Sequence, residues 1–453
     1  MPDSSLALDL VTSPVVGAAL PLLDLPASAP RDARPGISGA SPQELLSWFA
    51  DRGEPAFRAR QLADHIWSGR AGAFDDIHTL PGGLREALAA DYRFDTLVGT
   101  DRREADGGLT DKALHRLDDG RVVESVLMRY PARGSRRERT TLCISSQAGC
   151  AVGCPFCATG ELGLWRDLLP SEIIDQARYW RRELLAEGRR LTNIVFMGMG
   201  EPLLNADAVL AACAALSDGN RFGLGQRHIA VSTSGVIPGI ERLTALQRQY
   251  TLAVSLHAAR PELRDVLVPL NRRYPLHDVV RAATEYAEVT GRRVTYEMVM
   301  IDGINDTTAD ARATAALLRE RLAHVNLIPM NPVAHTPWQP SPPERVEAFA
   351  VILRAAGLDT TVRRNRGLDI GAACGQLAAE HAGQPAPDAV QRRRDMIERR
   401  SAAALANGAL ANGALANGAS GNGASASGGR APSGDRARAR TTRIQSGNVG
   451  ERA

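Results

Sequence analysis

The spacing of apolar residues changes twice along this chain. Between about residues 41 and 92 apolar side chains recur at helical intervals, whereas over 113–128 they alternate with polar ones, the period of a half-buried strand. From residue 141 to about 370, short apolar runs are followed repeatedly by longer amphipathic stretches. The pattern predicts a few helices, a β-hairpin and then a succession of strand–helix units.

The first folded segment is predicted to be a small helical accessory domain with a linker, over residues 40–111. Its first helix begins at Ser41-Pro-Gln-Glu44, where Ser41 caps the helix, proline occupies the first turn and Glu44 completes a capping box. A second helix starts at Pro55, and a third runs from about Leu84 to Tyr92.

Residues 112–140 are predicted to form a β-hairpin and a basic loop. The two strands are 113–117 and 122–128, joined by a turn at Asp118-Asp-Gly120. Five arginines follow the second strand, at positions 129, 133, 136, 137 and 139. This loop is either a solvated surface or a contact for phosphates, which position a nucleic acid without reading its sequence.

Residues 141–385 are predicted to be an α/β core. Strand candidates are 141–146, 191–197, 228–233, 251–256, 293–301 and 324–329. Helical stretches lie near 171–187, 206–217, 238–247, 276–290, 307–322 and 343–356. Six strand–helix units imply a parallel sheet with right-handed crossovers, and six units instead of eight predict an open, partial (β/α)6 barrel. Functional groups are then expected at the carboxyl ends of the strands.

Both ends of the chain are expected to be disordered. Residues 1–39 are rich in Pro, Ala, Ser and Gly without an amphipathic period, and we interpret them as a flexible leader. Residues 386–453 contain three copies of Ala-Leu-Ala-Asn-Gly at 404–418, then Gly, Ser, Ala and Arg. Since this composition is not expected to form a core, we predict a low-complexity tail that is dispensable for activity.

Composition indicates the class of protein and the cellular compartment in which we expect it. Hydrophobic residues make up 44% of the 453, enough for a sizeable core, and the net charge is only +3. Lys112 is the only lysine, and the bias towards arginine is as easily an effect of genome base composition as of phosphate binding. No run of apolar residues is long enough to span a membrane. Six cysteines without a secretory signal argue against a disulfide scaffold and favour the reducing cytoplasm.

The richest chemistry lies in Gln147-Ala-Gly-Cys-Ala-Val-Gly-Cys-Pro-Phe-Cys157, which spaces Cys150, Cys154 and Cys157 by four and three residues. A structural zinc site needs four ligands, and this loop offers three thiols and no histidine. An iron–sulfur cubane on three cysteines leaves one iron open to a chelating substrate. We therefore favour an open [4Fe–4S] cluster over a zinc knuckle that borrows a distant cysteine, or over buried thiols.

The cysteine motif carries a family resemblance. With Phe156 before its last cysteine, it is similar to the radical S-adenosylmethionine signature. The longer string from Cys143 to Gly160 resembles the bacterial dual-specificity rRNA/tRNA adenine-C2 methyltransferases (RlmN-like), and the resemblance runs from about Leu45 to Leu377. It implies a radical S-adenosylmethionine barrel and gives the helical accessory domain a role in gripping RNA.

The same resemblance implies where the cofactor binds. Phe196-Met-Gly-Met-Gly-Glu-Pro202 follows a predicted strand and resembles the motif that binds the methionyl amine, for which Glu201 offers a carboxylate. Other matching positions close later strands, where each residue by itself would more simply cap a turn. The implied cofactor contacts are Gly200, Glu201, Ser232, Ser255, Leu256, His257 and Asn331.

Three further residues are implied to act on the substrate. Cys374 lies among Gly and Ala, with arginines just upstream whose charge would favour its thiolate. In the resembling family its position becomes S-methylated, the position of Cys143 supplies a resolving thiol, and that of Glu124 accepts a proton. From the residues alone, Glu124 is equally a strand glutamate facing solvent, and Cys213 is a buried hydrophobe.

The resemblance implies two S-adenosylmethionine molecules per turnover: one methylates Cys374 and the other starts a radical reaction at C2 of adenine. Its substrates would be 23S rRNA and the adenine beside the anticodon of tRNA, which must be unstacked to react. A flavodoxin- or ferredoxin-like electron donor, a monomer and no membrane partner are expected. Adenine-C8 methylation, or an RNA-binding protein with a structural metal site, remain the alternatives.

Overall fold

The structure, a computed structural model, describes residues 32–132, 134–135, 137–333, 335–363, 367, 370–373, 375–376, 391 and 394–406. Among these residues no helix is long and apolar enough to cross a membrane.

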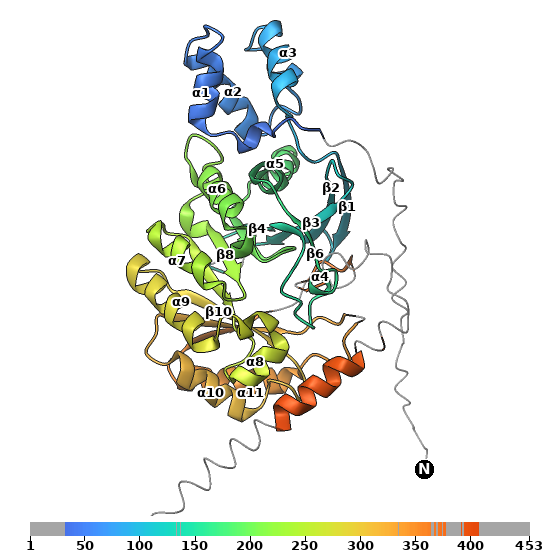
Figure 1. Ribbon diagram of the computed structural model, residues 1–453, viewed down its shortest axis with the longest axis vertical. Coiled ribbons are helices and arrows are strands. Elements are labelled where there is room, and N and C mark those ends of the chain that lie inside the picture. Colours follow the sequence, from blue (N-terminus) through green and yellow to red (C-terminus); the bar gives the residue numbers. More distant parts are fainter. Residues whose placement is uncertain are drawn as a thin grey trace, which may run out of the picture. The chain divides into compact units, whose positions relative to one another are not determined.

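A ten-stranded sheet organises the fold, in the order β1-β2-β3-β4-β7-β8-β9-β10-β11-β12 (Figure 1). Its strands are β1 (Gly99–Ala105), β2 (Thr110–Arg116), β3 (Val122–Tyr130), β4 (Arg139–Cys143), β7 (Asn193–Phe196), β8 (Ile229–Thr233), β9 (Thr251–Ser255), β10 (Val294–Met300), β11 (Ala323–Pro329) and β12 (Asp359–Val362). Strands β1 to β4 are antiparallel, and from β4 to β12 every pair is parallel. A separate antiparallel pair joins β5 (Gln147–Gly149) to β6 (Leu164–Asp167).

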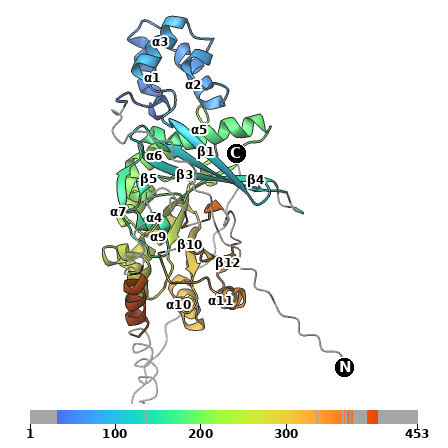
Figure 2. The same ribbon diagram turned by 90° about the vertical axis from the view of Figure 1, so that its right-hand side faces the viewer.

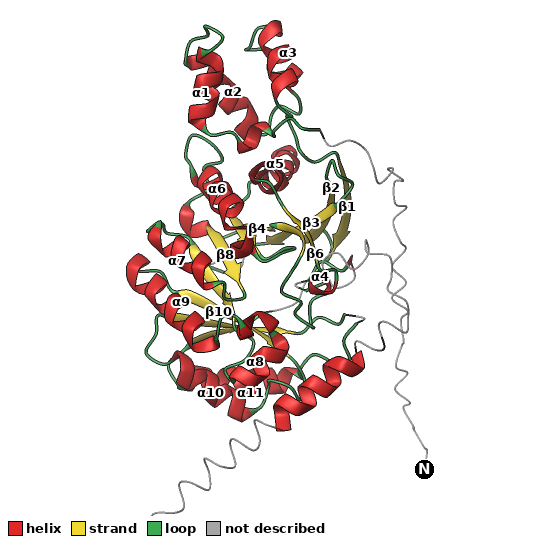
Figure 3. Ribbon diagram, viewed as in Figure 1, coloured by secondary structure: helices red, strands yellow, loops and turns green. Residues whose placement is uncertain are grey.

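Helices cover the outer side of the parallel strands, which Figure 3 shows in red against the yellow sheet. They are α5 (Pro170–Ala186), α6 (Ala206–Ser217), α7 (Ile237–Ala245), α9 (Leu276–Thr290), α10 (Thr308–Leu318) and α11 (Pro343–Ala355). Two short helices, α4 (Ala158–Glu161) and α8 (Pro261–Leu267), follow the cysteine motif and β9, and α8 packs in the same apolar cluster as Val152 and Phe156. Short 3-10 turns are η1 (Ile37–Gly39), η2 (Phe74–Asp76), η3 (Pro202–Asn205), η4 (Gln226–His228) and η5 (Pro269–Arg272). The predicted α/β class and the succession of six strand–helix units are confirmed.

One face of the strands supplies the core between sheet and helices. Four strand residues on this face are fully buried and belong to the main hydrophobic cluster: Leu142, Ile194, Ile229 and Leu252. Because side chains alternate along a strand, the neighbouring positions must point to the opposite, inner side of the curved sheet. That inner side is where polar residues of the strands gather.

The N-terminal helices are α1 (Pro42–Ala50), α2 (Phe57–Ser68) and α3 (Gly82–Asp91). The capping box is present as predicted: Glu44 N donates to Ser41 Oγ at 3.2 Å, and Ser41 N donates to Glu44 Oε2 at 2.6 Å. Two arginines of α5 attach this segment to the barrel: Arg178 Nη1 donates to Phe94 O at 2.9 Å, and Arg181 Nη1 to Trp67 O at 2.6 Å. This N-terminal segment is therefore joined to α5 by one buried and one partly buried hydrogen bond.

The short pair β5 and β6 was not predicted, and neither were two strands of the large sheet. Strand β1 lies in the expected linker, pairs with β2 from Gly99↔Arg116 to Ala105↔Thr110, and converts the hairpin into a three-stranded unit (Figure 2). Strand β12 adds a seventh parallel strand beside β11. Both are edge strands, and their mostly polar sequences lack the apolar alternation that marks a buried strand.

The predicted C-terminal tail requires a correction. Residues 394–406 are helical, and Ile397, Ser401 and Ala404 are buried at 2, 3 and 6% exposure. Their spacing of four and three residues places them on one helix face. Ile397 belongs to the same apolar cluster as Val152 and Phe156 of the cysteine loop. The prediction that residues 386–453 are disordered is therefore wrong for 394–406; residues 407–453 and 1–31 lie outside the described residues.

Candidate active site

Strand register places two of the predicted catalytic residues on the inner side of the sheet. Cys143, the last residue of β4, is opposite Val126 of β3, and Val126 is opposite Lys112 of β2. Glu124 lies two residues before Val126 and thus on the same face of β3. Because directly paired residues share a face, Lys112, Glu124 and Cys143 all lie on that inner side. Glu124 does not face solvent, since its exposure is 0%.

The same register extends across the barrel. Following the pairs from β4 through β7, β8, β9 and β10, the inner face carries Cys143, Ser232, Ser255 and Glu297. Leu256 is fully buried, and its backbone N donates to Glu297 O at 3.0 Å. The polar strand residues singled out in the sequence therefore come together on one surface, although their roles stay predictions.

The cysteine loop, residues 150–157, follows directly after β5. Gly149 has φ +81°, and a Cβ placed there would lie 2.0 Å from Gly163 O, so only glycine fits. Cys150 N donates to that same Gly163 oxygen at 2.8 Å. The residue before β6 thereby holds the start of the cysteine loop beside β5.

The three cysteines lie within electrostatic reach of one another. Burial raises the pKa of Cys150 to about 12, and the Cys157 thiol adds to the effect. Burial also raises the pKa of Cys154, with contributions from both other thiols. Three thiolates here therefore need nearby positive charge, which a bound metal centre supplies.

The donor set fits an iron–sulfur cluster better than a single ion. The loop supplies three thiols and no histidine, one ligand short of a closed zinc site. A zinc ion would need all its thiolates at about 2.3 Å from one centre. A cubane binds each thiolate at a different iron, so its ligands stand further apart.

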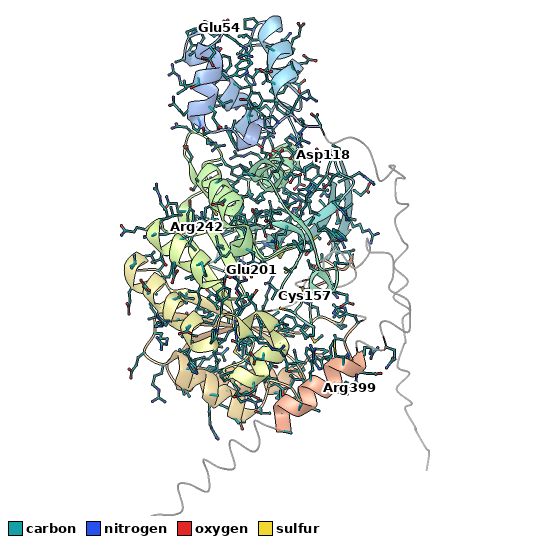
Figure 4. The ribbon with its side chains drawn as sticks, in the orientation of Figure 1. Glu54, Asp118, Cys157, Glu201, Arg242 and Arg399 are labelled. Atoms are coloured by element: carbon teal, nitrogen blue, oxygen red, sulfur yellow. The ribbon has the colours of Figure 1, made fainter. Side chains whose placement is uncertain are left out.

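Glu201 is fixed at the carboxyl end of β7. Its Oε2 accepts from Ser234 N at 2.7 Å and Ser234 Oγ at 2.5 Å, and its Oε1 accepts from Leu203 N at 3.1 Å. Burial raises the pKa of this carboxyl, and the Ser234 hydrogen bonds oppose that shift. The preceding Gly200 has φ +101°, and a Cβ there would lie 2.5 Å from Gln147 Cβ. Figure 4 labels Glu201 and Cys157, together with Arg242 on α7.

His257 ties the end of β9 to the cysteine loop. Its ring meets that of Phe156 edge to face, with centroids 4.8 Å apart, and its Nδ1 accepts from Val299 N at 3.1 Å. Burial lowers its pKa to about 3, so the ring is neutral. Its φ of +59° is uncommon for a residue other than glycine. The His257 side chain therefore packs between the end of β9 and the cysteine loop.

The loop after β11 also contacts the cysteine loop. Asn331 is buried at 4% exposure directly after this strand. Four residues later, His335 Nε2 is 2.9 Å from Pro155 O, a hydrogen bond whose direction requires the protonated tautomer at Nε2. Asn331 is thereby placed at the same edge as Glu201.

Cys374 lies outside the described residues, as do Arg364 and Arg366. Segments on either side of it are described and contact the site. Gly375 O accepts from Ala158 N at 2.6 Å, beside the last cysteine of the loop, and Gln376 Nε2 donates to Pro332 O at 3.1 Å. On the other side, Lys112 Nζ donates to Gly371 O at 3.5 Å.

Three residues that position this site were not predicted: Gln147, Ser234 and Arg264. Gln147 Oε1 accepts from Glu201 N at 2.8 Å. Arg264, buried in α8, donates to Ser234 O at 2.8 Å, Ser255 O at 3.1 Å and Leu256 O at 3.0 Å. Gln147 and Ser234 stand inside motifs that the sequence highlights, whereas nothing in the sequence marks Arg264.

A separate feature lies at the opposite, amino end of the strands. A groove of about 1530 Å³ runs between α1, α2 and α5 and the residues that precede β4, β7 and β8. We name it the arginine groove for its lining side chains: Arg60, Arg70, Arg137, Arg139, Arg181, Arg189, Arg190 and Arg221. Three acidic residues, Asp64, Glu138 and Asp218, share the lining, so positive charge prevails. Of the predicted basic loop, Arg133 and Arg136 lie outside the described residues.

Comparison with known proteins gives both family and fold. Residues 144–315 match the radical SAM superfamily. The probable dual-specificity RNA methyltransferase RlmN of Frankia alni is 49% identical over 365 residues, covering 78% of this chain and 86% of that protein. The protein of the same name from Gemmatimonas aurantiaca is 46% identical over 347 residues, covering 77% of this chain and 93% of that protein.

A solved structure agrees with the fold. The crystal structure of a radical SAM methyltransferase from Sphaerobacter thermophilus superimposes with a TM-score of 0.73 at 45% identity. The match covers 76% of this chain and 99% of that chain.

Proposed function

Because the chain belongs to the radical SAM family of RlmN-type dual-specificity RNA methyltransferases, we propose that it methylates C2 of adenine in RNA. The proposed substrates are 23S rRNA and the adenine beside the anticodon in tRNAs. The observation that carries the proposal is the placement of Glu124 and Cys143 on one inner face, next to the cysteine loop. A radical enzyme that only cleaved its cofactor would need neither a buried base nor a second thiol there.

Family membership implies a [4Fe–4S] cluster and S-adenosylmethionine. Cys150, Cys154 and Cys157 would hold the cluster, which supplies the electron for reductive cleavage of the cofactor. The carboxylate of Glu201, already oriented by Ser234, would bind the methionyl ammonium group. Ser232, Ser255, Asn331 and the backbone at 256–257 would complete the cofactor site, with two cofactor molecules used per turnover.

Three residues of the chain then carry out successive steps of the proposed reaction. Cys374 would carry the methyl group as a thioether. This methyl group would lose one hydrogen atom to the cleaved cofactor, so that its carbon bonds to C2 of the adenine, and the unpaired electron left on the adduct would return to the cluster. Glu124 accepts the C2 proton. The Cys143 thiolate attacks the Cys374 sulfur, so that a sulfur–sulfur bond forms while the carbon–sulfur bond breaks. The electron pair of the broken bond remains on carbon, which takes up a proton and becomes the methyl group.

The arginine groove supports an RNA partner of some length. Arginine binds phosphate through two parallel hydrogen bonds, and phosphate contacts position RNA without reading bases. Arg181 and Arg221 already donate to protein carbonyls, so the outer arginines 60, 70, 137 and 190 are the proposed phosphate ligands. A flavodoxin- or ferredoxin-like electron donor and a monomeric enzyme complete the proposal.

The test is the position of the new methyl group. Reconstituted enzyme should convert adenosine of unmodified 23S rRNA and tRNA to 2-methyladenosine, read by chromatography and mass spectrometry of digested nucleosides. Cys374→Ala is the control and should form none. Formation of 8-methyladenosine would replace the proposal with C8 methylation, and RNA binding without any methylation would favour a non-catalytic RNA-binding protein.

A further inference from the structure

We propose that Lys112 is a positioning residue for proton removal: its ammonium group holds the Glu124 carboxylate ionised and aimed, and connects it to the segment that leads into Cys374. The inference rests on the proposed function, because it presumes that Glu124 is the base. It adds a residue to which neither the sequence motifs nor the family comparison assigns a role.

Lys112 is unusual because it is the only lysine in the sequence and because its side chain is buried. The chain contains 54 Lys and Arg residues, and Lys112 is the only lysine among them. Its side chain is 1% exposed, in the middle of β2, and its Nζ is 3.7 Å from Glu124 Oε2, whose side chain is 0% exposed. Burying two charges costs several kcal/mol per ion before their attraction is counted, so such a pair is weak evidence for stability alone.

The strand register makes this pairing fixed. Lys112 is opposite Val126, and Glu124 lies two residues along β3, so the two side chains are diagonal neighbours on the inner face. Ser145 Oγ donates to Glu124 O at 2.6 Å and pins the backbone of the base. Cys143 occupies the same row as Lys112, two strands away. Base, cation and resolving thiol are thereby set by three adjacent strands.

A second contact of the ammonium group leads to the cysteine segment. Lys112 Nζ is 3.5 Å from Gly371 O, three residues before Cys374. A lysine ammonium carries three donors around a compact charge, so it can serve a carboxylate and a carbonyl at once. One cation therefore joins the proton acceptor to the chain segment that bears the proposed methyl carrier.

The chemistry of proton transfer requires this help. A buried carboxyl group favours its neutral form, in which it has no capacity to take the C2 proton. A cation 3.7 Å from one of its oxygens favours the carboxylate, and it also limits the directions that the oxygens take. In the proton-transfer step the C2–H bond breaks, its electron pair stays with the adenine ring, and the proton passes to a Glu124 oxygen.

Replacing the lysine should therefore stop the reaction at a definite stage. In Lys112→Met, Cys374 should still become methylated and still bond to C2, but release should stall because the proton remains. We expect turnover to fall by about 100-fold, the usual scale of a general base. The decisive sign is RNA that stays covalently attached to the protein on a denaturing gel, as in Glu124→Gln.

Three further variants separate positioning from folding. Lys112→Gln keeps a donor for Gly371 without the charge and should also stall. The double change Lys112→Met with Glu124→Gln removes both charges together and should match Glu124→Gln alone. Arg121→Met removes an exposed cation at the hairpin, over the Trp165 ring, and should turn over normally.

The outcomes divide cleanly. If the wild type makes no 2-methyladenosine, the proposed function fails. If the wild type does, but the folded Lys112 variants turn over normally or lose Cys374 methylation together with the adduct, this inference is overturned. If Lys112→Met does not fold, Lys112→Gln and the double variant decide by the same adduct measurement.

Discussion

At the scale of single residues, the side chains on the two faces of strand β2 make different contacts. Lys112 points to the inner side beside Glu124, while His115, three residues on, points to the helices. There His115 Nε2 is 2.7 Å from Ser125 Oγ, which accepts a hydrogen bond from Trp180 Nε1 at 2.7 Å. One short strand thus carries part of the proposed active site and part of its attachment to α5.

His115 gives a pH prediction. Burial lowers its pKa to about 3 from the usual 6.5, with a smaller effect of Arg182, so the folded protein holds the neutral ring. The unfolded chain binds a proton below about pH 6.5, and the stabilising contribution is therefore present above that pH and lost as the pH falls towards 3. Each pH unit costs about 1.4 kcal/mol at most.

Chemical unfolding at pH 7, 6 and 5 measures this contribution. His115→Gln should be less stable at pH 7 but show a flatter decline on acidification than the wild type. His78→Gln, an exposed histidine of the N-terminal segment, is the matched control and should decline as the wild type does. Parallel declines in wild type and His115→Gln would contradict the assignment.

At the scale of elements, the sequence pattern predicted those strands and helices whose buried residues recur at regular intervals. The six parallel strands and their helices follow from apolar runs, and the first helix from its capping box at Ser41. Strand β1 was missed because it is a polar edge, and the helix at 394–406 was missed because Ile397 is the only large side chain that it buries, beside arginines and an alanine-rich repeat. Candidate site residues were predicted where a motif marks them, whereas Lys112 and Arg264 are recognised only from strand register and long-range contacts.

The helix at 394–406 changes what truncation should do. A chain that ends at Gly408 should keep normal thermal stability and methylation. A chain that ends at Pro385 should lose both, because the apolar cluster of Val152 and Phe156 loses Ile397. Ile397→Ala alone should destabilise by about 2 kcal/mol or more, as for other buried aliphatic side chains.

Thermal unfolding of these chains, with Glu398→Ala as the exposed neighbouring control, measures the effect. Should the chain that ends at Pro385 unfold and methylate like the wild type, the helix has no structural role and the original expectation of a dispensable tail is restored.

At the scale of the whole molecule, the candidate active site and the arginine groove lie at opposite ends of the same strands. Glu201 follows the carboxyl end of β7, whereas Asn193, its first residue, lines the groove. A substrate that engages both must be larger than one nucleotide, which agrees with a folded RNA. Affinity for RNA and cleavage of the cofactor should therefore be separable by mutation.

Charge reversal in the groove tests that separation. Arg60→Glu with Arg70→Glu should raise KM for RNA about tenfold or more and reduce the salt dependence of binding, because fewer phosphate contacts release fewer counterions. Cofactor cleavage without RNA should not change. Arg242→Glu, on the exposed surface of α7, is the control and should leave KM unaltered. An unchanged KM in the groove variant would remove the groove from RNA binding.

The most direct measurement of the central claim is the covalent intermediate that Cys143→Ala should leave behind. Without the resolving thiol, RNA should remain joined to Cys374 through a methylene bridge at C2, visible as a protein band on a denaturing gel that ribonuclease shifts. Peptide mass spectrometry should find an adenine nucleotide plus one carbon on Cys374, and Cys143→Ala with Cys374→Ala should show no such band. Normal turnover by Cys143→Ala, or an adduct that persists without Cys374, would contradict the account.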